Sequence, residues 1–255
     1  MTGPGDLSDG GTAPRGTATP RVLVAVCTYN EMSNIAELVE RIFASLPHAD
    51  LLIVDDNSPD NTGRWAVDAA TRDPRLRVII REHERGLGSA TRRAFQYAVA
   101  QRYDFLLNLD GDLSHEPESL PTMLQRAIHD PQIDVVVGSR YCSGGSVQGW
   151  PLRRKIMSRM VNRFAVTCLR LPVSDCSGSM RCYRVAALAA IDPASLRSDG
   201  YAILEEVLIK LSARGAKMVE VPICFTDRQS GASKLTFGEA LRSARHLIHM
   251  AVARR

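Results

Sequence analysis

The chain has 255 residues, of which 45% are hydrophobic and 24% charged, as is usual for a soluble globular protein. This length suits one large α/β domain or at most two small ones. The formal net charge of +4 is too small to indicate a nucleic-acid-binding protein. No stretch approaches the roughly 20 apolar residues that span a bilayer. We therefore expect a protein that can touch a membrane but cannot cross one alone.

The N-terminal segment, residues 1–20, differs from the rest. It is rich in Gly, Thr, Pro and Asp and contains no apolar run. Such a segment cannot bury enough apolar surface to offset its ordering entropy, so we expect a disordered tail. It also lacks the basic and hydrophobic regions of a secretory signal.

Strands and helices are predicted to alternate along the first half of the chain. The predicted strands are apolar and rich in β-branched residues, and they span 21–27, 51–54, 77–80, 105–109 and 134–138. The predicted helices between them span 31–46, 62–71, 88–101 and 117–129. The less regular second half suggests helices at 152–171, 201–214 and 237–253 and strands at 177–183 and 219–225. This pattern predicts an α/β fold whose mainly parallel, doubly wound sheet has helices on both faces.

Polar clusters follow several of the predicted strands. They are residues 28–31, 55–56, 110–112 and 139–140. Ligands of doubly wound sheets bind at the carboxyl ends of the strands, so these clusters are candidates for one binding site. The dinucleotide fingerprint G-x-G-x-x-G is absent after the first strand, which argues against a dehydrogenase.

Asp110-Gly111-Asp112 follows the strand at 105–109. Two carboxylates one residue apart can both bind one hard divalent cation, and Gly111 allows a close approach of backbone or ligand. A solvated turn is the alternative, because Asp and Gly also favour turns. The position at a strand end, beside other acidic residues, favours the metal site.

Two further segments have both a functional and a structural interpretation. Asp55-Asp56 could accept hydrogen bonds from a ribose or a base, or it could form a helix N-cap or an Asx turn. The polar loop from Arg228 to Lys234 has a cation at each end and could close over a diphosphate. It could equally be a solvated surface loop.

The stretch 140–184 is strongly basic, and its only acidic residue is Asp175. Its helix at 152–171 combines arginines with an apolar stripe, which is typical of a segment at an anionic lipid surface. Arg154 and Ser158 are four residues apart and share a face of this helix. An ordinary core-packed helix with a charged outer face is the alternative.

Together these motifs resemble the family 2 glycosyltransferases, and within them the dolichyl- or polyprenyl-phosphate mannosyltransferases. The matching motifs, in chain order, are Thr28 to Glu31, Val54 to Asp60, Gly86 to Gly88, Asp110 to His115, Gly138 to Tyr141, Trp150 to Leu152, Arg154-Lys155, Ser177 to Ser179 and Arg228 to Lys234. They cover nearly everything from Arg21 to about Phe237. The chain departs from the family at Cys27, where Pro is usual, at Gly111, the middle of a D-A-D, and at Leu204-Glu205-Glu206, where Gln-x-Glu is frequent.

The resemblance implies a GT-A fold, GDP-mannose as the donor and Mg²⁺ or Mn²⁺ as the cofactor. The donor-binding residues it implies are Cys27, Tyr29, Glu31, Val54, Asp56, Asp110, Gly111, Asp112, Arg140, Arg228 and Lys234. Asp110 and Asp112 would hold the metal. The catalytic residues it implies are Asp112 together with Arg140, Arg154 and Ser158, the last three at the phosphate of a polyprenyl phosphate acceptor.

The resemblance also predicts the organisation of the chain. One GT-A domain would occupy residues 21–255, with 140–184 facing the acceptor and the membrane and 226–236 closing over the donor. Some members carry C-terminal transmembrane helices, and this chain is similar to the short members, which rely on a membrane-anchoring partner or on peripheral attachment. The six cysteines form no C-x-x-C pair, which favours reduced thiols. We therefore expect a peripheral protein at the cytoplasmic face of a membrane.

An acceptor phosphate is already anionic near neutral pH, so it can attack the anomeric carbon without a strong general base. A single displacement would invert that carbon and give a β-linked mannosyl phosphate. The nearest rival is the same chemistry with another donor, such as UDP-glucose. A processive or protein-directed transferase is disfavoured by the lack of a Q-x-x-R-W motif. A non-catalytic nucleotide-sugar-binding subunit is disfavoured because the charged residues of the site are all present.

Overall fold

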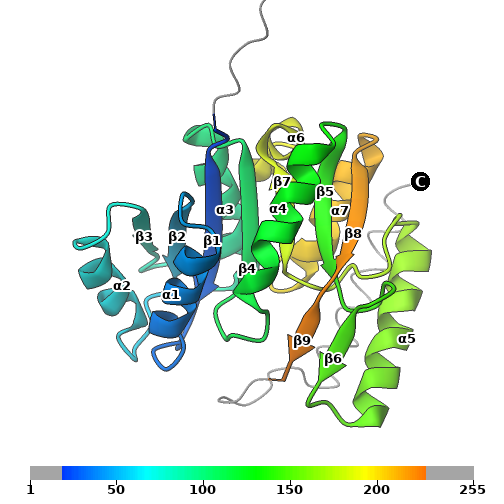
Figure 1. The fold of residues 1–255 in the computed structure, drawn as a ribbon, viewed down its shortest axis with the longest axis horizontal. Coiled ribbons are helices and arrows are strands. Elements are labelled where there is room, and N and C mark those ends of the chain that lie inside the picture. The colour runs from blue at the N-terminus through cyan, green and yellow to red at the C-terminus, as the bar shows by residue number, and fades with distance from the viewer. Residues whose placement is uncertain (1–18, 228–255) are drawn as a thin grey trace, which may run out of the picture.

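The computed structural model describes residues 19–227 (Figure 1). A seven-stranded sheet has the order β3-β2-β1-β4-β7-β5-β8. The strands are β1 (Val22–Thr28), β2 (Asp50–Asp55), β3 (Leu76–Ile80), β4 (Phe105–Asp110), β5 (Ile133–Ser139), β7 (Arg181–Arg184) and β8 (Lys217–Pro222). Only β7 runs antiparallel to its neighbours within the described sheet, so the predicted α/β class with a mainly parallel sheet is confirmed.

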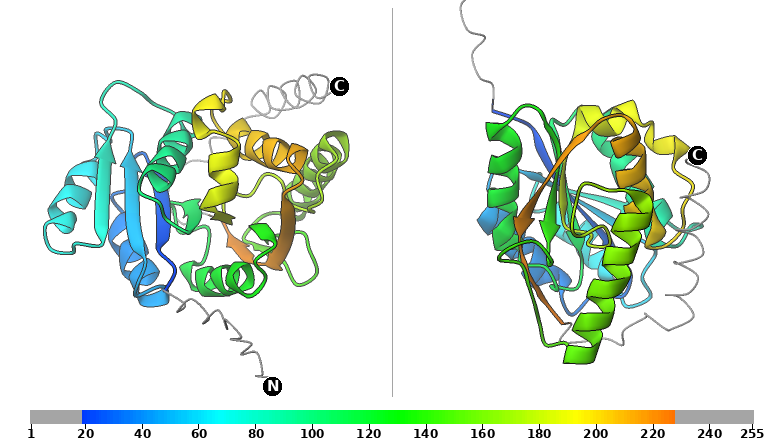
Figure 2. Two further views of the ribbon diagram at one scale, coloured as in Figure 1. Left: turned by 90° about the horizontal axis from the view of Figure 1, so that it is seen from above. Right: turned by 90° about the vertical axis from the view of Figure 1, so that its right-hand side faces the viewer.

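Helices cover both faces of the sheet (Figure 2). On one side lie α1 (Ile35–Ser45), α2 (Thr62–Ala70) and α4 (Leu120–His129), the last preceded by the 3₁₀ turn η1 (Pro117–Ser119). On the other lie α3 (Leu87–Ala100), α6 (Val185–Ala190) and α7 (Ala202–Ala213). In β1, Leu23 and Ala25 pack into one apolar cluster while Val24 and Val26 pack into the other. Burial on both faces explains why the strands are continuously apolar.

The register of the central strands brings the polar strand ends together. Thr28 of β1 lies opposite Asp55 of β2, and Cys27 lies opposite Asp110 of β4. Because these three strands are parallel, their carboxyl ends meet at one edge of the sheet. The sequence motifs that follow them are therefore neighbours in space, as we predicted.

Two predicted strands are only partly right. The segment 219–225 contains parts of two strands, because the chain leaves β8 at Pro222 and begins β9 (Cys224–Thr226) in a second sheet. Proline cannot donate to a continuing ladder, which favours the break. In the segment 177–183 only β7 is extended, because the backbone N–H groups of Ser177 and Gly178 donate to Asp175 instead of to a neighbouring strand.

The predictions missed three short elements, α6, the strand β6 (Ser146–Gln148) and the 3₁₀ turn η2 (Pro193–Ser195). Strand β6 pairs with β9, so the second sheet was not foreseen. These elements have three to six residues each, too few for a hydrophobic period to be visible in the sequence.

Helix α5 (Leu152–Leu169) lies beside β6, at the far end of the molecule from α2 (Figure 1). Only Asn162, Ala165 and Leu169 of this helix are buried. Many apolar side chains on it remain exposed, namely Leu152, Ile156, Met157, Met160, Val161 and Phe164. No helix within residues 19–227 is both long and apolar enough to cross a bilayer.

Several predictions fall outside the described residues. These are most of the tail at 1–20, nearly all of the loop at 226–236 with Arg228 and Lys234, and the terminal helix at 237–253. The division into a tail, one domain and two functional regions stays a prediction.

Candidate active site

A cavity of about 500 Å³ opens at the carboxyl ends of β1, β2 and β4. Its lining consists of Cys27, Thr28, Tyr29, Glu31, Asp56, Arg85, Gly86, Leu87, Ala90, Asp110, Gly111, Asp112, Gly200 and Tyr201. The described donor residues implied by the sequence all line it, except Val54 and Arg140. Val54 is fully buried in β2 opposite Cys27, so it supports the wall from behind. We call this space the donor cavity.

The two adjacent carboxylates at the end of β2 have different surroundings. Asp55 is fully buried and accepts hydrogen bonds from Thr28 Oγ1 at 2.7 Å and from the backbone N–H and hydroxyl of Ser58. Asp55 thus forms the turn that the sequence left open as an alternative. Asp56 lines the donor cavity instead. Of the two carboxylates, only that of Asp56 can contact a ligand in the donor cavity.

Asp110, the last residue of β4, and Asp112, in the loop that follows, line the same cavity. Gly111 between them is tightly enclosed, because a Cβ at this position would lie 3.2 Å from Thr28 Cγ2 and 3.3 Å from Glu31 Cγ. Asp112 Oδ1 accepts the backbone N–H of Ser114 at 3.0 Å, which fixes that carboxylate in a tight turn. The pair therefore presents two oriented carboxylates to one space.

These carboxylates fit a hard divalent cation. Within residues 19–227 no cluster of three or more His, Cys, Asp or Glu side chains is arranged to enclose a metal. Mg²⁺ and Mn²⁺ nevertheless bind through one or two carboxylates when substrate phosphates and water supply the other ligands. Asp110 and Asp112 thus suit a metal that arrives with a diphosphate, and they do not suit a permanent structural ion.

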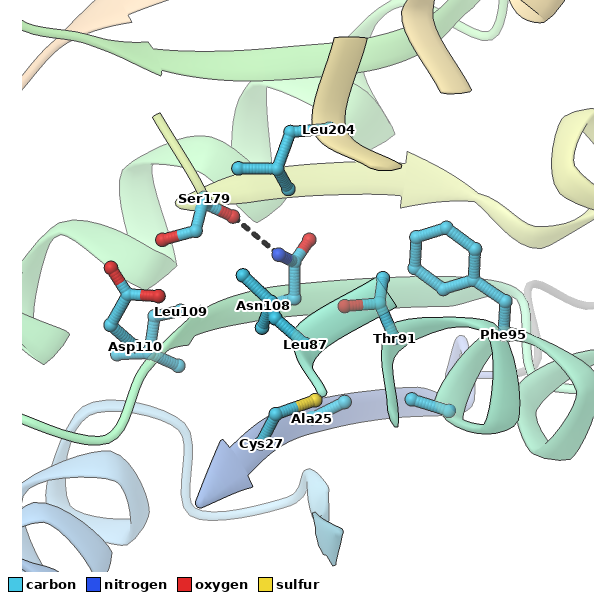
Figure 3. Close-up of a pocket in the computed structure, with 11 residues that line it drawn as sticks. Ala25, Cys27, Leu87, Thr91, Phe95, Asn108, Leu109, Asp110, Ser179 and Leu204 are labelled. Atoms are coloured by element: carbon cyan, nitrogen blue, oxygen red, sulfur yellow. Dashed lines mark hydrogen bonds between the residues drawn. The ribbon is translucent and has the colours of Figure 1, made fainter. Parts of the chain in front are cut away.

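A small cavity of about 20 Å³ lies beneath Asp110 (Figure 3). Cys27, Thr91, Asn108 and Ser179 contribute polar atoms to it, and Asn108 donates its side-chain N–H to the carbonyl of Ser179. The space is large enough for about one water molecule. Burial raises the pKa of Cys27 to about 12, so this thiol stays neutral and is no nucleophile near pH 7.

His115 lies between the Asp110 carboxylate and Phe225. Its Nδ1 lies 3.6 Å from Asp110 Oδ2, and its ring meets that of Phe225 edge-on at 5.2 Å. Burial lowers the pKa of His115 although the nearby Asp110 carboxylate opposes this shift. Neither ring nitrogen has a hydrogen-bond partner among the residues described.

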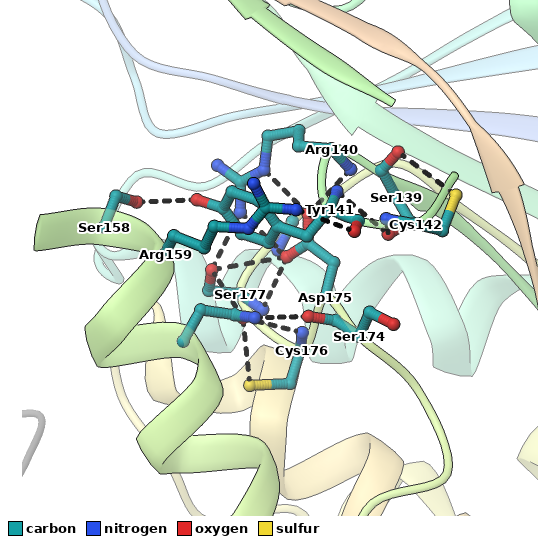
Figure 4. A network of polar contacts seen from close by, with 12 residues as sticks. Ser139, Arg140, Tyr141, Cys142, Ser158, Arg159, Ser174, Asp175, Cys176 and Ser177 are labelled. Carbon is teal, nitrogen blue, oxygen red and sulfur yellow. Dashed lines mark hydrogen bonds and ion pairs between the residues drawn. The ribbon is translucent and has the colours of Figure 1, made fainter. Parts of the chain in front are cut away.

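Arg140, at the end of β5, is held in a buried ion pair (Figure 4). Its Nε and Nη2 donate to Asp175 at 2.7 and 2.8 Å, and Nη2 also donates to Ser177 Oγ at 2.8 Å. Burial alone would lower the pKa of Arg140, but the fully buried Asp175 carboxylate raises it above its ordinary value. Arg140 is thus a fixed cation with its charge largely compensated, a pairing that the sequence did not predict.

Arg154 and Ser158 lie on α5, and both have partners. Ser158 Oγ shares a 2.7 Å hydrogen bond with the Tyr141 hydroxyl, and the Tyr141 ring lies 5.0 Å from the Arg140 guanidinium (Figure 4). Arg154 pairs with Asp227 at 3.2 Å and stacks over Trp150 at 4.0 Å. Its side chain is 36% exposed, so this ion pair is weak and accessible.

Phe225 lies between the two halves of the site. Its ring contacts His115 on one side and Trp150 at 5.4 Å on the other, and the Arg140 guanidinium lies 5.5 Å from its centre. Two rings, His115 and Phe225, therefore separate Arg140 from Asp110, and Trp150 is a third ring between Arg154 and Asp110. We call Arg140, Tyr141, Arg154 and Ser158 the acceptor cluster.

Several residues of this site were not predicted from the sequence. Asp175 could have been found, because a single acid within a basic stretch is a strong candidate for a buried ion pair. Tyr201 and Gly200 line the donor cavity from the start of α7, far along the chain, and no local pattern marks them. Arg85 lines it too, with its guanidinium 5.5 Å from the Tyr29 ring.

Comparison with known proteins identifies the family of the chain. The family model described as "Glycosyl transferase family 2" matches residues 23–192. The chain is 36% identical over 247 residues to a polyprenol monophosphomannose synthase of Mycolicibacterium smegmatis, covering 96% of this chain and 92% of that protein. It is 37% identical over 218 residues to an undecaprenyl-phosphate mannosyltransferase of Micrococcus luteus, covering 86% and 88%.

The fold also matches a solved structure, the glucosyl-3-phosphoglycerate synthase of Mycobacterium tuberculosis in complex with Mn²⁺, UDP and phosphoglyceric acid. The TM-score is 0.67 at 18% identity, and the match covers 92% of this chain and 78% of that one. At this identity the likeness concerns the fold alone, and it agrees with the GT-A fold implied by the sequence motifs. On the family model and these relatives, the chain belongs to glycosyl transferase family 2.

Proposed function

We propose that this protein transfers mannose from GDP-mannose to a polyprenyl phosphate with inversion, giving polyprenyl β-D-mannosyl phosphate. The observation that carries the proposal is the adjacency of two anion sites of different kinds. A cavity with Asp56, Asp110 and Asp112 suits a nucleoside diphosphate and its metal, and the acceptor cluster, rich in cations, lies next to it across Phe225. The two relatives, each named for mannosyl transfer to a polyprenyl-type phosphate, support the same substrates.

On the donor side, Asp56 would accept hydrogen bonds from the nucleoside, with Cys27, Tyr29 and Glu31 around it. Asp110 and Asp112 would hold Mg²⁺ or Mn²⁺ against the diphosphate, and the cation supplies neutralisation of the charge that grows on the leaving GDP. Arg228 and Lys234, which lie outside the described residues, remain predicted to close over the same diphosphate.

On the acceptor side, a polyprenyl phosphate is ionised near neutral pH, so no side chain has to remove a proton from it. The protein has to orient it, which well-placed cations and hydroxyls can do. Arg140, kept rigid by Asp175, and Ser158, joined to it through Tyr141, would bind the phosphate from two elements. Arg154 would exchange its accessible Asp227 partner for the phosphate.

Helix α5 would bring this site to a lipid surface. It combines exposed apolar side chains, such as Ile156, Met160 and Phe164, with the exposed cations Arg153, Arg159 and Arg163. That combination is typical of helices that lie at an anionic membrane interface. We therefore place the protein peripherally at the cytoplasmic face of a membrane, by itself or with a membrane-anchoring partner.

The test is incubation with GDP-mannose, Mg²⁺ or Mn²⁺ and a short-chain polyprenyl phosphate, with the product identified by mass. The expected product carries one mannosyl residue linked through phosphate, and the β configuration is checked by NMR. The matched polyprenyl alcohol, which lacks the phosphate, is the control and should not react. Transfer from UDP-glucose with none from GDP-mannose would contradict the proposed donor.

A further inference from the structure

Asp56 is held by Gly86, which lines the donor cavity, and by Arg81, which does not. Its Oδ1 accepts from both Nε, at 2.7 Å, and Nη2 of Arg81, and its Oδ2 accepts from the backbone N–H of Gly86 at 2.7 Å. The side chains of Asp56 and Arg81 are 8% and 5% exposed. Asp56 lines the donor cavity, whereas Arg81 is outside its lining. Arg81 can therefore influence a bound nucleotide only through its neighbours.

The rest of the Arg81 guanidinium fastens the loop that follows it. Nη1 donates to Ser89 Oγ at 2.6 Å, and Nη2 donates to the carbonyl of Gly86 at 3.1 Å. The Arg81 backbone N–H donates to the carbonyl of Asp55 at 2.8 Å. One buried side chain thus joins the end of β2 to the start of α3. Both of these segments form walls of the donor cavity.

The hydrogen bonds from Arg81 and Gly86 limit the acceptor positions that Asp56 can offer to a ligand. A carboxylate offers roughly four acceptor positions. Arg81 occupies two of them and Gly86 one, so the free acceptor capacity is concentrated on Oδ2 and points in a single direction. A donor group on the nucleoside must approach along that direction. The geometry is set before the nucleotide binds, which reduces the entropic cost of binding.

We propose that Arg81 is a positioning residue for the nucleoside subsite, which holds the Asp56 carboxylate and the Gly86 backbone in the orientation that receives the nucleoside of the donor. The proposal rests on the proposed function in that Asp56 binds the donor nucleoside. It adds a residue that touches neither substrate and that a donor-site motif does not mark. A shorter or more flexible cation cannot replace it, because an ammonium lacks the planar fork that bridges Asp56, Gly86 and Ser89 at once.

The test is Arg81→Lys, with Arg75→Lys as the matched control. Arg75 also pairs with an aspartate, Asp73 at 2.6 Å, but it precedes β3 at the opposite end of that strand from the cavity. Affinities for GDP, UDP and inorganic pyrophosphate are measured by calorimetry or competition with Mn²⁺ present. We expect Arg81→Lys to weaken nucleotide binding about tenfold, since an Asp56 carboxylate that is no longer held in place would lose one charge-assisted hydrogen bond to the nucleoside, and such a loss has this scale. Pyrophosphate affinity should stay within twofold, because it does not reach Asp56.

Steady-state kinetics provide a second readout. Arg81→Lys should raise the donor KM while leaving the acceptor KM and the kcat at saturating donor close to wild type, which a general loss of folding would not do. Ser89→Ala removes the hydrogen bond from Arg81 Nη1 and a 3.2 Å hydrogen bond from Ser89 Oγ to the Gly86 carbonyl, and it is the variant to use if Arg81→Lys does not fold. It should weaken nucleotide binding two- to threefold with pyrophosphate unchanged.

Unchanged nucleotide affinity in both variants, or an equal loss for nucleotide and pyrophosphate, would overturn the proposal. If the wild type binds UDP but not GDP, and Arg81→Lys weakens UDP, the proposed donor is wrong and the role of Arg81 stands. Wild-type protein that binds neither nucleotide would overturn both.

Discussion

The residues around the donor cavity and those of helix α5 differ in how firmly the rest of the molecule holds them. The cavity wall consists of strand ends whose carboxylates are fixed by short, buried hydrogen bonds, as in the Asp55 turn and the Asp56–Arg81 pair. Helix α5 buries only Asn162, Ala165 and Leu169 and leaves a long apolar surface exposed. The donor cavity is thus pre-formed, whereas the acceptor cluster combines one rigid cation, Arg140, with groups on a helix of which few residues are buried. Under the proposed function we expect donor recognition to be strict and acceptor recognition to rely partly on the lipid surface.

Asn162 is the buried polar side chain that links helix α5 to the loop beside Arg140. Its side-chain oxygen accepts from the backbone N–H of Cys176 at 3.0 Å, and its nitrogen donates to the carbonyl of Ser174. Helix α5 is thereby linked to the loop that carries Asp175, the partner of Arg140. The five predictions below test the contrast between the rigid and the adjustable side.

The largest effect is expected for Asp112→Asn, on the rigid side. The neutral amide binds a divalent cation poorly, so we expect transfer to fall by about 10²–10³-fold. The measurement is the transfer rate over a range of Mn²⁺ and Mg²⁺ concentrations. Asp130→Asn, which removes an exposed pair with Lys217, is the control and should stay near wild type. A wild-type rate with unchanged metal dependence would remove Asp112 from the metal site.

Asp175→Asn tests the anchor of the acceptor side. It leaves Arg140 buried without its charged partner, so the free energy of unfolding at pH 7 should fall by about 3–5 kcal/mol. Asp73→Asn, which breaks a partly exposed pair, should cost at most about 1 kcal/mol. Urea unfolding measures both. An equal loss of unfolding free energy in the two variants would show that the buried pair stabilises the protein no more than the partly exposed pair.

The same pair predicts a pH dependence. Burial raises the pKa of Asp175, but Arg140 outweighs this and lowers the pKa below its ordinary value. A carboxyl whose pKa is lower in the folded state stabilises the protein above its unfolded pKa of about 4, and this stabilisation is lost as the pH falls. The difference in unfolding free energy between wild type and Asp175→Asn should therefore shrink below about pH 4. A difference that stays constant down to pH 3 would contradict the assignment.

A smaller effect is expected for Arg154→Ala, on the adjustable side. Because Arg154 is partly exposed and already paired, its removal should raise the acceptor KM about tenfold, the lower end for a charged hydrogen bond. The donor KM should not change. Arg153→Ala, one residue away on α5, is the control, and kinetics with a short-chain acceptor phosphate measure both. An unchanged acceptor KM would take Arg154 out of the site.

The smallest effect is expected for single polar substitutions on the exposed surface of α5. Each of Ile156→Ser and Phe164→Ser removes partly exposed apolar area, so binding to vesicles should weaken severalfold, equivalent to about 1 kcal/mol. Sedimentation with vesicles rich in anionic lipid measures this. Val67→Ser changes a similarly exposed residue on α2 and should have no effect. Loss of vesicle binding in all three variants would show that α5 is not the contact surface.

Much of the donor side was predictable because its signals are local. Continuous apolar runs predicted β1, β2 and β4, and their parallel pairing brought Tyr29, Asp56 and Asp110 to one edge. The second sheet was not predictable, because β6 and β9 are three residues long and become strands only by pairing with each other. Of the two aspartates ending β2, the sequence alone did not decide which would form the turn.

By itself, the sequence determined the α/β class, the succession of the main strands along the chain and the acidic motif at the end of β4. Hydrophobic period and residue spacing, on which these predictions rest, are properties of neighbouring positions. The tertiary structure alone decided which charged groups meet. Arg81 reaches Asp56 across 25 positions and Arg140 reaches Asp175 across 35. Such pairs form because burial makes an unpaired charge costly, and which charges become buried together depends on how the strands and loops pack.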